Sequence, residues 1–141
     1  VRIGAHSHFH DVTLTGVHPK RTRPTSPWRF ERFAQVPADQ LRTMSIRSRL
    51  AFQGFEFRDG RLKTRPEADW EDFIRRDTEL CLEWFARHIN RQPDLYGFPF
   101  NEYSPKLIAI LKSYGFKEFY AGSSVKHAEV IGRTDVEELA A

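Results

Sequence analysis

The second half of the chain alternates between helix-type and strand-type segments. Apolar residues recur at spacings of three and four over residues 67–89, which predicts one long helix. A short apolar run at 95–98 predicts a buried strand, residues 104–115 predict a second helix, and residues 117–121 predict another strand. With a further apolar run at 1–5, this order predicts an α/β fold built on a parallel sheet or a (β/α) barrel.

The ends and the apolar face of the long helix are marked in the sequence. Pro66 before it and Asn90 after it are typical of a helix start and a helix end. The residues predicted to face the core are Trp70, Phe73, Ile74, Cys81, Trp84, Phe85 and His88. Cys81 is the only cysteine, so the chain forms no internal disulfide, and its place on this face predicts a small core residue rather than a nucleophile.

Residues of about 18–64 are predicted as an insertion between the first strand and the long helix. Three prolines predict an irregular loop within residues 12–33, and residues 37–50 predict a short helix. Asp59-Gly60 lies between two strand-type runs and predicts a β-hairpin with a type I′ turn. The whole chain, residues 1–141, is then a single domain with an insertion.

The basic charge of the chain is concentrated in this insertion. Between Lys20 and Arg49 there are eight basic residues against two acidic ones, although the net charge of the chain is only +3. Aromatic side chains lie between these cations, which is one feature of nucleic-acid-binding surfaces. The 40% share of hydrophobic residues excludes a disordered chain, and no apolar run is long enough to cross a bilayer.

Three histidines follow the first strand. His6, His8 and His10 lie within five residues, and a helical turn there would place His6 and His10 on one face. Two neutral imidazoles are nitrogen ligands that zinc favours, and a carboxylate as third ligand would leave a position open for water. The pattern predicts a metal site at His6 and His10. The alternative is that these are exposed or helix-capping histidines that bind no ligand.

An aromatic and proline-rich turn joins the buried strand to the second helix and reads Tyr96-Gly97-Phe98-Pro99-Phe100-Asn101-Glu102-Tyr103. From the residues alone, the favoured interpretation is that these rings pack in the core, as clusters of aromatic side chains usually do. The alternative, suggested by the position of the turn ahead of a capped helix, is that backbone N–H groups near Phe100 and Asn101 face a ligand.

These two stretches together resemble the polysaccharide deacetylase family of carbohydrate esterases. The family's metal motif, His-Ser/Thr-x-x-His after a strand, is matched by His6-Ser7-His8-Phe9-His10, in which Ser7 would brace the loop. The turn at 96–103 is similar to the family's stretch aromatic-Ala-Tyr-Pro-aromatic-Gly-x-Tyr, and residues 131–136 are similar to its short Arg-Ile-x-Val type ending. The resemblance covers residues 1–136 apart from the insertion and hairpin, and implies a partial or distorted (β/α) barrel.

The resemblance implies a metal-dependent hydrolase that removes N-acetyl groups from the amino sugars of a polysaccharide or glycan. The implied cofactor is a divalent metal, first of all zinc, held by His6 and His10. The implied catalytic group is the backbone N–H of Phe100, which would stabilise the oxyanion. The residues implied to bind the substrate, an N-acetylated glycan or a lipid-linked sugar, are Phe98, Pro99, Asn101 and Tyr103.

The sequence also departs from the family. The first family motif, Thr-Phe-Asp-Asp-Gly, supplies the catalytic base and the third metal ligand and has no counterpart here. The general-acid motif Leu-x-His is also missing, and His127, the only histidine near its place, is expected on the surface.

Because the sequence begins inside an apolar run at Val1, we expect the C-terminal portion of such an enzyme, whose unpaired sheet edge would favour self-association. A catalytically inactive carbohydrate-binding relative is the first alternative. A nucleic-acid-binding module that uses the basic residues of 20–49 is a further one.

Overall fold

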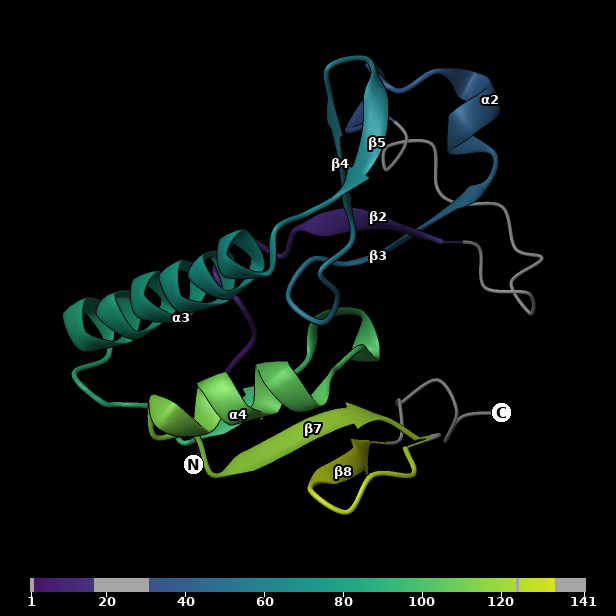
Figure 1. Cartoon of the computed structure of the whole chain (residues 1–141). Coiled ribbons are helices and arrows are strands. Elements are labelled where there is room, and N and C mark those ends of the chain that lie inside the picture. The colour runs from purple at the N-terminus through teal and green to yellow at the C-terminus, as the bar shows by residue number, and fades with distance from the viewer. Residues whose placement is uncertain (1, 17–30, 124, 134–141) are drawn as a thin grey trace.

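The computed structural model describes residues 2–16, 31–123 and 125–133, and within them the strands form two four-stranded sheets (Figure 1). One sheet is parallel, with the strand order β1 (Gly4–Ala5), β6 (Leu95–Gly97), β7 (Glu118–Gly122) and β8 (Val130–Arg133). The other is antiparallel, with the strand order β3 (Met44–Ser48), β2 (Val12–Gly16), β4 (Phe55–Arg58) and β5 (Arg61–Thr64).

Two helices pack on one face of the parallel sheet, namely α3 (Glu67–His88) and α4 (Pro105–Ser113). Residues alternate along the strands, so Tyr96, Phe119 and Ala121 are buried against the helices while Tyr120 lies on the opposite face. The predicted parallel sheet is confirmed, although the sequence did not predict β8, and the barrel stays a prediction. None of the described helices is long and apolar enough to cross a membrane.

The predicted long helix is confirmed as α3. On the face predicted to pack against the core, the buried residues are Trp70, Ile74, Cys81 and Phe85. The prediction is wrong for Trp84 and His88, which are exposed and stack on each other with 4.8 Å between ring centroids. Trp84 and His88 are four residues apart, so they lie one turn above the other on the same exposed side of α3.

The insertion is more regular than the sequence predicts. The irregular loop predicted over residues 12–33 is wrong at its start, because β2 forms there, and residues 17–30 lie outside the described part of the chain. The helix predicted over residues 37–50 is limited to α2 (Ala38–Leu41), because the residues after it form β3. Ile46 of β3 pairs with Leu14 of β2, and both are buried. The apolar residues of 44–48 therefore serve a sheet rather than a helix.

Two predicted local features, a hairpin turn and a helix cap, are confirmed. Asp59 and Gly60 join β4 to β5, and their φ angles of 54° and 76° are both positive, as a type I′ turn requires. Ser104 caps α4, because its hydroxyl accepts a hydrogen bond from the N–H of Leu107 at 3.3 Å, and Pro105 occupies the first turn.

A buried carboxylate joins the antiparallel sheet to the parallel one. Glu102 follows the 3-10 turn η1 (Pro99–Asn101) and accepts hydrogen bonds from the Ser48 N–H at 3.0 Å and from Arg47 Nε at 3.3 Å. A buried carboxylate is tolerated where donors and a positive charge compensate it. The end of β3 is thereby held beside the turn at residues 96–103.

Gly54→Ala is expected to destabilise the antiparallel sheet. Gly54 has a φ of 66°, and a Cβ there would lie 2.7 Å from the carbonyl oxygen of Leu14 and closer still to the side chain of Thr13. Because strain and overlap add, the free energy of unfolding should fall by about 2 kcal/mol or more in urea denaturation. Gly16→Ala is the control, since nothing lies within 4 Å of its new Cβ, and it should cost less than about 1 kcal/mol. Equal losses would contradict the packing described.

Candidate functional site

Two loops meet at the carboxyl edge of the parallel sheet. The histidine loop, residues 6–10, follows β1, and the aromatic-proline turn, residues 96–103, begins within β6. Strands β1 and β6 are parallel neighbours, so their carboxyl ends lie side by side. In α/β folds this edge is the usual place for a ligand site.

The loop that follows β1 does not contain the helical turn that would place His6 and His10 on one face. Residues 6–10 contain no helix, and Ser7 and His10 have positive φ angles of 70° and 50°. The rings of His6 and His10 nevertheless meet, with their centroids 5.1 Å apart. A positive φ costs free energy for a residue other than glycine, so this loop depends on contacts outside itself.

Asp77 supplies those contacts from the middle of α3. Its fully buried carboxylate accepts hydrogen bonds from the Ser7 hydroxyl at 2.9 Å and from the N–H groups of His8 and Phe9 at 3.1 and 2.8 Å. The Ser7 hydroxyl oxygen accepts a further bond from the N–H of His10 at 3.0 Å. One carboxylate and one hydroxyl thus satisfy three backbone N–H groups, and Ser7 braces the loop.

The charge of Asp77 also acts on two buried neighbours. Burial first, and then the negative charge of Asp77, raise the pKa of the Cys81 thiol and of the Tyr96 hydroxyl. Both groups therefore stay protonated near neutral pH. The prediction that Cys81 is a core residue is confirmed.

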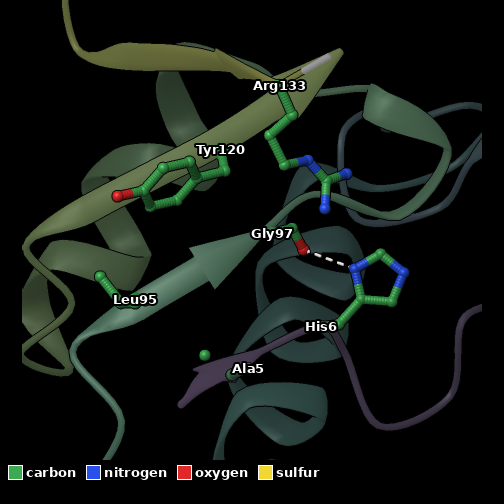
Figure 2. Close-up of a pocket in the computed structure, with 7 residues that line it drawn as sticks. Ala5, His6, Leu95, Gly97, Tyr120 and Arg133 are labelled. Atoms are coloured by element: carbon green, nitrogen blue, oxygen red, sulfur yellow. Dashed lines mark hydrogen bonds between the residues drawn. The ribbon is translucent and has the colours of Figure 1, made fainter. Parts of the chain in front are cut away.

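One hydrogen bond fixes which ring nitrogen of His6 is available to a ligand. His6 Nδ1 lies 2.8 Å from the carbonyl oxygen of Gly97, across the boundary between β1 and β6 (Figure 2). A carbonyl oxygen only accepts, so Nδ1 carries the proton and the neutral ring keeps its lone pair on Nε2. Metal-binding histidines have this arrangement, because their second ring nitrogen donates to a carbonyl or carboxylate.

The histidine pair, His6 and His10, fits two positions of a metal site. Two imidazoles on one tetrahedral zinc have ring centroids about 5 Å apart, since each Zn–N bond is about 2.1 Å long. The observed separation of the two rings is 5.1 Å. Within the described ranges, no group of three or more His, Cys, Asp or Glu side chains gathers as a metal site. The described residues therefore bring two imidazoles together, without a third metal-ligating side chain that would make such a group.

A hollow of about 480 Å³ lies beside His6 on the face of the parallel sheet away from the helices (Figure 2). Its lining residues are Gly4, Ala5, His6, Leu95, Gly97, Tyr120 and Arg133. A Cβ on Gly97 would lie 3.5 Å from His6 Nδ1 and 3.6 Å from Arg133 Nη1, so a side chain there would fill the space between these two groups. The glycine leaves an imidazole and a guanidinium facing the same hollow.

The residues predicted to bind the substrate are divided between the core and the surface. Phe98 and Pro99 are buried, and Phe98 stacks on Phe119 with ring centroids 5.8 Å apart. Asn101 is exposed, and its Oδ1 accepts a hydrogen bond from Arg133 Nη2 at 3.0 Å. Phe98 and Pro99 therefore hold the turn, while Asn101 lies at the surface.

The remaining predicted residues lie on the two sides of the turn. Phe100 has a φ of 58°, and its ring centroid is 4.4 Å from that of His10. Tyr103 is half-buried and contacts the rings of Phe98 and His127, with centroids 5.3 and 5.6 Å away. Phe100 is thus brought to the histidine pair. His127 is half-buried against the turn rather than fully exposed at the surface.

Sequence reasoning missed three residues that shape this site: Asp77, Gly97 and Arg133. A signal existed for Asp77, an acidic residue on the apolar face of α3, three positions after Ile74 and four before Cys81. The role of Gly97 depends on its carbonyl group, and that of Arg133 on the unpredicted strand β8. Neither role has a signature in a single sequence.

Asp77→Asn is expected to loosen the histidine loop. The new amide presents an NH₂ donor to the N–H and O–H donors of the loop, so the free energy of unfolding should fall by about 2–4 kcal/mol. Asp72→Asn is the matched control, since Asp72 is exposed on the same helix and the change should cost less than about 0.5 kcal/mol. Denaturant unfolding compares the two variants. A similar small loss in both would show that the loop does not depend on the carboxylate.

No protein-family model matches this chain, and no curated protein matches it significantly in sequence. Solved structures do match. A de-N-acetylase from Aggregatibacter actinomycetemcomitans aligns with a TM-score of 0.53 at 14% identity, and the BpsB deacetylase domain from Bordetella bronchiseptica with 0.55 at 12%. IcaB from Ammonifex degensii aligns with a TM-score of 0.45 at 19% identity, over 53% of this chain and 35% of that one.

The first two alignments cover 68% and 85% of this chain. In the other direction, this chain spans 39% of the Aggregatibacter protein and 54% of the BpsB domain. At these identities the likeness concerns the fold. The chain therefore shares the α/β fold, with its parallel sheet, of two structures described as de-N-acetylase and deacetylase.

Proposed function

We propose that this chain carries part of the active site of a metal-dependent hydrolase that removes N-acetyl groups from the amino sugars of a glycan. The histidine pair is the observation that carries the proposal. Gly97 fixes His6 with its lone pair on Nε2, and the ring of His10 lies 5.1 Å away. The fold shared with two deacetylase structures supports the same class of reaction.

In this proposal His6 and His10 hold a divalent ion, with zinc first because it favours imidazole nitrogen. A carboxylate outside the described residues completes the donor set. When bound, such an ion supplies Lewis-acid chemistry towards water and carbonyl groups. The part of this chain is to keep two imidazoles at a fixed separation, which Asp77 achieves through the loop and Gly97 through the His6 ring.

In this proposal Phe100 is the substrate-binding residue that lies nearest to the histidine pair. Its ring contacts that of His10, with the centroids 4.4 Å apart, and this contact supports a position of residue 100 beside the pair. We assign its N–H to the carbonyl oxygen of the acetamide group. A donor with a fixed direction stabilises the negative charge that develops there, because it does not reorganise during the reaction.

The sugar itself is proposed to lie along the exposed part of the turn. Asn101, which Arg133 holds in place, and the half-buried ring of Tyr103 are the side chains that a sugar can reach. Phe98 and Pro99 support these residues from the core. A ring such as that of Tyr103 suits the C–H face of a pyranose.

Zinc titration of the purified chain tests the histidine pair. We expect one zinc ion to bind and to shift the ring signals of His6 and His10, and His6→Ala to weaken binding at least about tenfold because a ligand is lost. His8→Ala is the matched control, since this ring packs on Phe9 in the same loop, and it should stay within about threefold of the parent chain. Equal weakening in both variants would remove the pair as the binding site.

Acetate release tests the reaction. We expect the full-length polypeptide with zinc to release acetate from an N-acetylglucosamine oligosaccharide, and His10→Ala to lower the rate at least about 100-fold. His8→Ala should keep most of the rate. A polypeptide that binds the oligosaccharide without releasing acetate would instead support the inactive carbohydrate-binding alternative.

A further inference from the structure

Three arginines line a second hollow beside the histidine loop. This hollow has a volume of about 390 Å³, and its lining residues are Phe9, Asp11, Arg32, Arg49, Phe73 and Arg76. Phe9 and Asp11 lie in and directly after the histidine loop, Arg32 precedes α2, and Arg49 follows β3. The other two residues belong to α3. We call this set of residues the arginine pocket. It is distinct from the hollow beside Gly97, with which it shares no residue.

Asp11 organises the arginine pocket. Its side chain is only 7% exposed, and it forms ion pairs with Arg49, at 2.9 Å, and with Arg32. The guanidinium of Arg49 also lies over the ring of Phe73, 3.9 Å from the ring centroid, and Phe9 stacks on the same ring. Two of the guanidinium groups are thus held before any ligand arrives, which lowers the entropy cost of binding.

The pocket keeps more positive charge than Asp11 neutralises. Three guanidinium groups face one carboxylate, which leaves a local charge of about +2. Arg76 is exposed and has no hydrogen-bond or ion-pair partner among the described residues, and the buried Nε of Arg49 has no hydrogen-bond partner there either. Burial first, and then the charge of Arg49, lower the pKa of nearby Arg65. An anion is the ligand that this excess of charge favours.

The position of the pocket connects it to the proposed reaction. Phe9 and Asp11 directly precede and follow His10, so the pocket and the histidine pair share one loop. A glycan bound at the pair would reach these guanidinium groups by extending from His10 along the loop to Asp11. Planar guanidinium groups bind carboxylate and phosphate oxygens with paired hydrogen bonds.

We propose that the arginine pocket binds an oxyanion, a carboxylate or a phosphate, that the N-acetylated substrate carries. The identity of the substrate as an N-acetylated sugar rests on the proposed function, whereas the anion site rests on the pocket alone. The preferred substrate is then an acidic or phosphorylated amino sugar rather than a neutral one.

Ligand titrations of the purified chain, monitored through its amide signals in NMR, test the inference. The probes are N-acetylmuramic acid, N-acetylglucosamine 6-phosphate, neutral N-acetylglucosamine and inorganic phosphate. At least one of the two anionic sugars should bind about tenfold more tightly than the neutral sugar and shift signals of Phe9, Asp11 and Phe73. Which of them binds more tightly distinguishes a carboxylate from a phosphate. Salt raised from about 0.05 M to about 0.5 M should weaken this binding severalfold.

A double variant and a matched control make the test specific. Arg32→Gln with Arg76→Gln removes two charges from exposed side chains while Arg49 still pairs with buried Asp11, so the fold should persist. In this variant the anionic sugars should bind no better than the neutral one. Arg87→Gln removes a charge from an exposed position in the last turn of α3, away from the pocket residue Arg76, and should leave the preference unchanged.

The outcomes separate the inference from the proposed function. Phosphate that binds the pocket while no N-acetylated sugar binds would support the anion site and contradict the glycan substrate. Equal binding of neutral and anionic sugars would overturn the anion site and leave the deacetylase proposal standing. An anion preference that persists in the double variant would also overturn it.

Discussion

The buried carboxylate of Asp77 holds together the part of the molecule on which the proposed chemistry depends. A fully buried carboxylate costs free energy unless donors surround it, and here the donors are the Ser7 hydroxyl and two N–H groups of the histidine loop. This set of hydrogen bonds compensates both the buried charge and the two positive φ angles of the loop. It also explains how His6 and His10 meet without a helical turn. The pair of imidazoles is therefore a consequence of one helix residue some seventy positions away along the chain.

Two more buried carboxylates attach the insertion to the candidate site. Asp11 pairs with Arg49 next to the histidine loop, and Glu102 binds Arg47 and Ser48 next to the aromatic-proline turn. Both contacts bind the segment around the end of β3. The antiparallel sheet is thus attached to each of the two loops that form the candidate site, and it supplies arginines to a pocket beside one of them. What the sequence suggests as a decorating insertion is, in the structure, a support for the site.

Local signals made part of this arrangement predictable. The periodic apolar face gave α3, the Asp59-Gly60 turn gave the hairpin, and the spacing of the histidines gave the candidate pair. Strands β2 and β3 were missed because their stability comes from pairing across the chain, as between Leu14 and Ile46. The contact between the two histidines was expected for the wrong reason, since Asp77 rather than helical periodicity produces it. The hydrogen bonds between Asp77 and the histidine loop join residues about seventy positions apart, and no local pattern in the sequence indicates them.

The most direct test of the account is the protonation of the His6 ring, read from its nitrogen signals in long-range ¹H–¹⁵N NMR of the metal-free chain. The account predicts that the neutral ring carries its proton on Nδ1, because Nδ1 donates to the Gly97 carbonyl. Addition of zinc should then shift the Nε2 signal. A ring protonated on Nε2, or an Nε2 signal that zinc leaves unchanged, would contradict the claim that this chain presents His6 as a metal ligand.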